Sequence, residues 1–240
     1  LRKGIYWHDF TDPVTGKEHR NVEVTAEDFK FFVDVVKNPE VNCGPMRVYY
    51  QDLESVEILG RYEFEVRWSR EYYGSKASTL GLSPLPRHLY HAYDGPFDGK
   101  KFNEDHIRNR MIVGCGPYQF VKWEKDRRVV FRRNPRYFGL RYGAGPSLDY
   151  LVYEIIKHPN TRFQALLSGE LDQLGLSPDQ WIQRADEKPF KDGTLKRYKY
   201  LLPQYTYIGW NLRNPLFSDA RVRRALTMLI DRERIRKDVY

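Results

Sequence analysis

Apolar residues early in the chain recur with the period of a helix. Within residues 24–37 they fall at intervals of three and four positions, which predicts a helix with one apolar face. The positions on that face are Phe29, Phe32, Val33 and Val36. Asp28 stands three positions after Thr25, which is the spacing of an N-terminal capping box. The pattern therefore predicts the helix and also the residues that begin it.

Two hairpins are predicted from alternating and β-branched runs. The first pairs residues 56–58 with residues 62–68 across a turn near Gly60, and the strict alternation in its second strand predicts one buried face. The second pairs residues 118–123 with residues 129–132 across a charged tip. Between the hairpins, a proline-rich stretch spelling "SPLPRHLY" predicts a loop that enters a short helix.

A glycine pair just before the second hairpin raises the alternative of a phosphate-binding loop. Gly114 and Gly116 flank Cys115, but a dinucleotide-binding fingerprint needs a further glycine and a helix directly after it. Pro117 and a β-type run follow instead, so no helix N-terminus is predicted that could hold an anion. The segment is interpreted as the entry to a hairpin.

Elements in the second half alternate irregularly between strand and helix. The run at 148–156 is almost continuously apolar, which predicts a strand covered on both faces. A helix over 163–167 is expected to end at Gly169. Further helices are expected from Ser177-Pro178, over 222–230 with Ser218 or Asp219 as cap, and from Asp231, and further strands at 171–174, 195–202 and 205–210. Hairpins followed by β-α-β units predict a mixed α/β architecture.

The charge balance is basic but dispersed. The 240 residues include 40 Lys and Arg against 32 Asp and Glu, a formal net charge of +8. Acidic residues are interleaved with the basic ones, so binding of nucleic acid is not favoured. No run approaches the roughly 18 apolar residues of a membrane span. The pattern begins as if within a strand and stops within a helical run, which predicts a segment of a longer protein.

Candidate catalytic and metal-binding groups are sparse. Cys43 and Cys115 lack the C-x-x-C spacing of metal sites, and a disulfide and two free thiols both remain open. A His/Asp-rich group near the start of the chain fits no helical metal motif and lies in a polar loop. Its members are His8, Asp9, Asp12 and His19. No G-x-S-x-G nucleophile elbow occurs. No metal, no cofactor and no catalytic residue is predicted, and the protein is not expected to be an enzyme.

The order of these segments resembles a known family. The carrying motifs are "VTAEDFKFFVDVVKNPE", the pair "LESVEIL" and "YEFEVRW", "LSPLPRHLY", "VGCGPYQFVKWEKDRRVVFRRNPRYFG", "LDYLVYEII", "RFQALLSGELD" and "GWNLRNPLFSDARVRRALTMLIDRERI". In this succession they are similar to the family 5 extracellular solute-binding proteins of peptide ABC importers. The chain departs from the family in the polar stretch 11–21, in Cys115 between the two glycines, and in its length, because family members run about twice as far.

The resemblance implies a fold and a division into domains. It implies a mixed α/β, periplasmic-binding-protein-like fold of type II, peptide-binding subclass, present here as a partial copy of two lobes. Residues 1–82 would belong to the small second domain of peptide-binding members, residues 83–211 to the first lobe, and residues 212–240 to the start of the other lobe.

The resemblance also places segments along a ligand cleft. Thr79 and Gly81 would lie in the first, where small residues let backbone approach a ligand, although a core-packing connector is an equal alternative. Gly175 and Ser177 would lie in the second, which presents main-chain groups to the peptide in the family. Ser177 has the alternative role of capping the helix that follows it.

A third segment would cross between the lobes. Its ligand-binding candidates are Tyr207, Trp210 and Asn211. The alternative is that the aromatic side chains of this run belong to a core. The carboxylate that would neutralise the amino terminus of a bound peptide is expected beyond residue 240.

The implied function is that of a receptor which captures short peptides and delivers them to a membrane permease. The expected partners are a short peptide and the permease subunits of an ABC importer, with no nucleic acid and no stable oligomer required. The expected location is periplasmic or extracellular, with or without a lipid anchor. The alternatives are a receptor for a non-peptide solute, such as a sugar or a metal complex, and a sensor module without a transport role.

Overall fold

The computed structural model describes residues 1–70, 73–93, 95–184, 186–200 and 205–239. The chain forms two compact units, Leu1–Ile155 and Ile156–Tyr240. Each unit is built mainly from elements close in sequence. The domain boundaries expected after residues 82 and 211 stay predictions.

Helix α1 (Ala26–Lys37) is the centre of the first unit. It begins with the predicted capping box, in which the Asp28 carboxylate accepts a hydrogen bond from the Thr25 backbone amide at 2.9 Å. The predicted apolar face is packed, with Phe32, Val33 and Val36 buried. The helix also buries a second face, which the periodicity did not predict.

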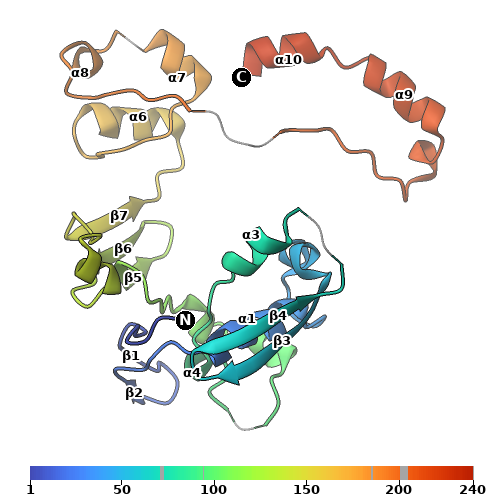
Figure 1. The fold of residues 1–240 in the computed structure, drawn as a ribbon. Helices are drawn as coiled ribbons and strands as arrows, with labels where there is room; N and C mark the ends of the chain where they lie inside the picture. Colours follow the sequence, from blue (N-terminus) through green and yellow to red (C-terminus); the bar gives the residue numbers. More distant parts are fainter. Residues whose placement is uncertain (71–72, 94, 185, 201–204, 240) are drawn as a thin grey trace. The chain divides into compact units, whose positions relative to one another are not determined.

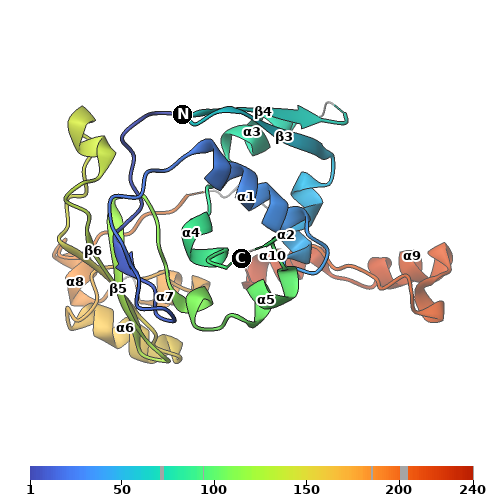
Figure 2. The ribbon, with the colours of Figure 1, turned by 90° about the horizontal axis from the view of Figure 1, so that it is seen from below.

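The two faces of α1 contact different elements. On one side lies the predicted hairpin of β3 (Leu53–Gly60) and β4 (Glu63–Trp68), paired antiparallel with Val56 opposite Val66 (Figure 1). On the other side lie α4 (Arg87–Tyr90) and α5 (Gly99–Glu104) (Figure 2). On this side Phe31 and Val35 are buried, and Tyr90, Phe97 and Phe102 pack against their cluster. Two-sided packing therefore accounts for apolar residues off the predicted stripe.

Shorter elements complete this part of the first unit. They are β1 (Phe10–Thr11), β2 (Glu18–His19), α2 (Gly44–Arg47), η1 (Val48–Tyr50), α3 (Ser75–Leu80) and η2 (Arg108–Arg110). Strands β1 and β2 pair antiparallel, so the polar stretch interpreted as a loop contains a small hairpin. Both cysteines are free and partly buried, which decides between the two alternatives left open by the sequence.

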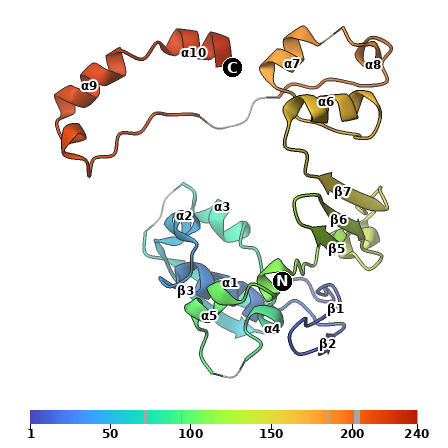
Figure 3. The ribbon, with the colours of Figure 1, turned by 180° about the vertical axis from the view of Figure 1, so that it is seen from behind.

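A three-stranded antiparallel sheet ends the first unit. Strands β5 (Tyr118–Glu124) and β6 (Arg128–Arg133) form the predicted second hairpin, and β7 (Tyr150–Glu154) pairs with β6 (Figure 3). The turn η3 (Phe138–Tyr142) lies between β6 and β7. The prediction that the 148–156 strand is covered on both faces is wrong here. Tyr150 and Val152 on one face of β7 and Tyr153 on the other are exposed, so among the described residues neither face of this strand is fully covered.

Helices dominate the described part of the second unit. They are α6 (Pro159–Leu167), α7 (Pro178–Gln183), α8 (Lys188–Lys191), η4 (Pro215–Phe217), α9 (Ala220–Met228) and α10 (Arg232–Val239). Helix α6 ends before Gly169, which takes a left-handed φ of 81° as predicted for a helix terminator. Asp219 caps α9 by accepting a hydrogen bond from the Arg221 amide, which confirms one of its two predicted caps.

The strands predicted in the second unit are not formed. Residues 171–174, 195–200 and 205–210 carry no strand, and residues 201 and 202 of the second prediction lie outside the described residues. An extended run becomes a strand only when it pairs with a neighbouring strand through a ladder of backbone hydrogen bonds, and none of these runs is paired in that way among the described residues. The expected β-α-β units are therefore absent from the described residues, where every sheet is antiparallel.

Candidate functional site

The second unit contains a hollow of about 1000 Å³ between its helices and the segments that join them. Figure 3 shows α6, α7, α8 and the run that follows α8. The lining residues are Leu166, residues 172–178, Trp181, Ile182, Phe190 and residues 194–200. The size falls at the upper end of the range for ligand pockets, and the lining combines apolar rings with charged side chains.

One wall of the hollow is the predicted segment from Leu174 to Ser177. No hydrogen bond among the described residues uses the backbone groups of Leu174, Gly175 or Leu176. An ideal Cβ built on Gly175 meets no heavy atom within 4 Å, so the backbone there is open to approach. Backbone donors and acceptors of this kind require water or a ligand as partner.

Ser177 has the capping role that the sequence left as an alternative. Its hydroxyl accepts a hydrogen bond from the Gln180 amide at 3.2 Å, and the Gln180 side chain accepts one from the Ser177 amide at 3.1 Å. Two backbone donors at the N-terminus are thereby satisfied within α7. The side chain of Ser177 is engaged by the helix although the residue lines the hollow.

A second run that lines the hollow, residues 194–200, was not identified from the sequence as part of a site. Arg197 donates a hydrogen bond to the Trp181 carbonyl at 2.8 Å, and its guanidinium carbon lies 4.8 Å from the centre of the Trp181 ring. The guanidinium therefore holds this run against α7. The alternation of basic and tyrosine residues in "KRYKY" was the available signal, but it was interpreted only as a strand.

The third predicted segment does not line the hollow. Tyr207 is 75% exposed, and its ring centre lies 6.0 Å from that of Tyr205. The Trp210 ring packs at 5.4 Å from Phe217, and the Asn211 side chain accepts a hydrogen bond from the Arg213 amide at 3.1 Å. Their roles as ligand contacts stay predictions.

Thr79 and Gly81 belong to the first unit. The Thr79 hydroxyl accepts a hydrogen bond from the Trp68 indole at 2.9 Å and donates one to the Ser75 carbonyl at 2.8 Å. Gly81 ends α3, and an ideal Cβ there would lie 3.0 Å from the Ala77 carbonyl oxygen. Both residues thus take part in local structure, and both their ligand contacts and the core-packing alternative stay predictions.

The His/Asp-rich group near the start of the chain is used for packing and ion pairs. His8 lies between the Gly116 carbonyl at 3.1 Å and the Gly114 amide at 3.4 Å, and burial lowers its pKa. Asp9 pairs with Arg136 at 2.7 Å. Among the described residues, no three His, Cys, Asp or Glu side chains gather in a way that could hold a metal ion.

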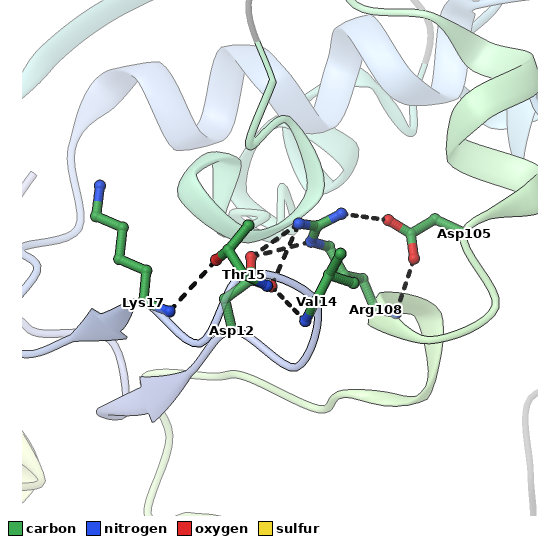
Figure 4. A network of polar contacts seen from close by, with 6 residues as sticks. All are labelled: Asp12, Val14, Thr15, Lys17, Asp105 and Arg108. Atoms are coloured by element: carbon green, nitrogen blue, oxygen red, sulfur yellow. Dashed lines mark hydrogen bonds and ion pairs between the residues drawn. The ribbon is translucent and has the colours of Figure 1, made fainter.

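Asp12 of this group forms a buried ion pair with Arg108 (Figure 4). Its carboxylate also accepts hydrogen bonds from the Val14 and Thr15 amides at 2.8 and 3.0 Å. Burial raises the pKa of Asp12, but the Thr15, Val14 and Arg108 hydrogen bonds outweigh it, so the pKa lies below its usual value. Asp105 accepts a hydrogen bond from the same guanidinium at 2.8 Å.

His88 packs among three rings of the first unit, and one of its ring nitrogens is buried. Its ring centre lies 5.2 Å from that of His19, 5.4 Å from Phe10 and 6.1 Å from Trp7. Its Nε2 is buried and has no hydrogen-bond partner among the described residues. Burial, followed by the nearby His19, lowers the pKa of His88 to about 4. No role was assigned to His88 from the sequence.

No helix among the described residues combines the length and the hydropathy that crossing a membrane requires. The full chain, residues 1–240, matches the family model described as bacterial extracellular solute-binding proteins, family 5 Middle. It is 29% identical over 238 residues to the oligopeptide-binding protein AppA of Bacillus subtilis (strain 168), a match that covers 98% of this chain and 39% of that protein.

Solved structures show the same relationship. The chain resembles AppA from Bacillus subtilis in complex with a nonapeptide, with a TM-score of 0.75 at 26% identity over 98% of this chain and 42% of that one. It also has the fold of NikZ from Campylobacter jejuni, solved with Ni(L-His), with a TM-score of 0.69 at 23% identity over the same 98% and 42% shares. The chain thus covers less than half the length of either protein and holds part of a mixed α/β, type II periplasmic peptide-binding fold. It belongs to the bacterial extracellular solute-binding proteins of family 5.

Proposed function

We propose that this protein is the substrate-binding receptor of an ABC importer and that its substrates are short peptides. The observation that carries the proposal is the hollow of the second unit, with the free backbone groups of Leu174, Gly175 and Leu176 in its wall. A peptide in extended conformation offers complementary donors and acceptors regardless of its sequence. A wall of this kind therefore suits recognition of peptides with many different sequences.

The side-chain environment of the hollow supports the same proposal. The rings of Trp181, Phe190 and Tyr198 line a space of about 1000 Å³, which is large enough for apolar side chains together with water. Ordered water adapts a site to side chains of different shape at little cost in affinity. Such a site binds through the peptide backbone and accepts variation at the side chains.

Further contacts and partners belong to the proposal through the family. Thr79, Gly81, Tyr207, Trp210 and Asn211 would contact the peptide or the hinge once the remaining part of the fold completes the cleft. The permease subunits of an importer would receive the closed, loaded form at the extracellular or periplasmic face of the membrane. In this form of receptor the second lobe supplies the rest of the binding energy on closure.

Native mass spectrometry of the protein at its natural length, purified without refolding, tests the proposal. Release of a heterogeneous set of masses that sequence as short peptides would support it. One defined non-peptide mass would replace the peptide by another solute, as for the nickel–histidine complex in NikZ. An empty protein whose melting temperature does not rise with a mixture of peptides would overturn the transport function itself, since bound ligand stabilises the native state.

A further inference from the structure

The charges around the hollow are unbalanced. Three cationic side chains line it, those of Lys196, Arg197 and Lys199, against the single carboxylate of Asp172. All three cations lie on the run that follows α8, whereas the segment from Leu174 to Ser177 also lines the hollow. One lining run is therefore basic, while another offers backbone groups.

The three cationic side chains differ in whether they already interact with other residues of the protein. Arg197 is held by the Trp181 carbonyl and lies 4.8 Å from the Trp181 ring centre and 5.7 Å from that of Phe190. By contrast, no ion pair within the described residues involves Lys196 or Lys199. The charge of the two lysines is thus available to a ligand.

We infer that the hollow selects short peptides that carry Asp or Glu side chains, an inference that rests on the proposed peptide-binding function. A lysine ammonium is a compact charge on a flexible stem, so it can follow a carboxylate at different positions along a peptide. The rings of Trp181, Tyr198 and Tyr200 line the same hollow and suit the apolar residues that neighbour the acidic one.

The expected size of the preference follows from the exposure of the lysines. A single exposed pair of a lysine and a carboxylate contributes less than a factor of about five in affinity, and two pairs contribute about tenfold. Because the pairs are reached by solvent, salt at about 0.5 M is expected to remove most of the preference. A peptide with lysine in place of glutamate would be repelled and bind more weakly than a neutral one.

The test uses the full-length protein and three alanine pentapeptides with Glu, Gln or Lys at the second and fourth positions. Isothermal titration calorimetry should give Kd values in the order Glu, Gln, Lys, with the Glu peptide about tenfold tighter than the Gln peptide at low salt. In the Lys196→Gln, Lys199→Gln double variant the Glu and Gln peptides should bind equally. Lys188→Gln, a lysine of α8 outside the hollow, is the matched control and should keep the preference.

The Gln peptide distinguishes a missing preference for acidic peptides from a missing ability to bind peptides. If it binds and the Glu peptide binds no tighter, the inference about acidic peptides is overturned while the proposed function stands. If the preference exists but survives in the double variant, Lys196 and Lys199 are not its source and the inference is equally overturned. If none of the three peptides binds, the proposed function fails and takes the inference with it.

Discussion

Arg108 and Asp12 form an ion pair 96 positions apart in the sequence, with N–O distances of 3.0 to 3.2 Å. The side chain of Asp12 is 1% exposed and that of Arg108 is 13% exposed, so water screens neither charge well. The pair joins the turn of the β1–β2 hairpin to η2 (Figure 4). It fixes the start of the first unit to a segment more than a third of the chain away.

Replacing Arg108 alone should destabilise the protein strongly. Arg108→Met leaves the Asp12 carboxylate buried without its cation, which costs about 3 kcal/mol in the free energy of unfolding. The double variant Arg108→Met, Asp12→Asn should recover part of this loss because no unpaired charge remains. Denaturant unfolding of the full-length protein measures both values. Arg110→Met in the same turn is the matched control, and equal costs at the two arginines would contradict the role given to the pair.

His88 should make stability fall in mild acid. Its pKa is about 4 in the folded protein against 6.5 for an ordinary histidine, so the unfolded chain binds more protons between these values. Unfolding is therefore favoured as the pH falls from about 6.5 to about 4. His8 and His19 also have lowered pKa values, so their protonation in the unfolded chain adds to the effect.

The variant His88→Phe isolates the contribution of this histidine. Phenylalanine keeps a ring among Trp7, Phe10 and His19 and cannot be protonated. When the pH is lowered from 7 to 5, the free energy of unfolding of His88→Phe should decrease by about 1–2 kcal/mol less than that of the original protein. The exposed His158→Phe is the control. Parallel curves of unfolding free energy against pH for the original protein and His88→Phe would contradict the prediction.

Ser177 should matter for stability more than for binding. Ser177→Ala removes the hydroxyl that caps α7, which costs about 1 kcal/mol, whereas Ser177→Asn retains a capping oxygen without adding a charge to the hollow. Peptide affinity should change less than twofold in either variant, because main-chain groups form this wall of the hollow. Thermal unfolding and calorimetric titration separate the two effects. A tenfold loss of affinity in both variants at unchanged stability would instead make the hydroxyl a ligand contact.

The elements predicted well are those decided by neighbours in sequence. Thr25 with Asp28, Ser177 with Gln180, and Asp219 all cap helices where the sequence indicated, because each cap forms within three positions along the chain. The two hairpins were also predicted correctly, since a short turn fixes the pairing of adjacent runs.

The features missed depend on contacts that no local pattern encodes. The second buried face of α1 exists because α4 and α5 return to it, and Phe31 alone gives no sign of that contact. The extended runs at 195–200 and 205–210 have β-type composition, but composition supplies no partner strand. For the same reason the hollow, which needs residues 172–178 and 194–200 to meet, was only half identified.

Gly175 provides the most direct test of the hollow as a binding site. Its φ is not left-handed and an ideal Cβ there meets no atom within 4 Å, so Gly175→Leu should fold with a change in stability of less than about 0.5 kcal/mol. The new side chain would occupy space in the wall where a peptide backbone approaches, and peptide affinity should fall at least about tenfold. Gly44→Leu is the matched control, because Gly44 has equally open surroundings but lies in α2 of the first unit. Unchanged affinity in a folded Gly175→Leu protein would place the peptide somewhere other than the hollow.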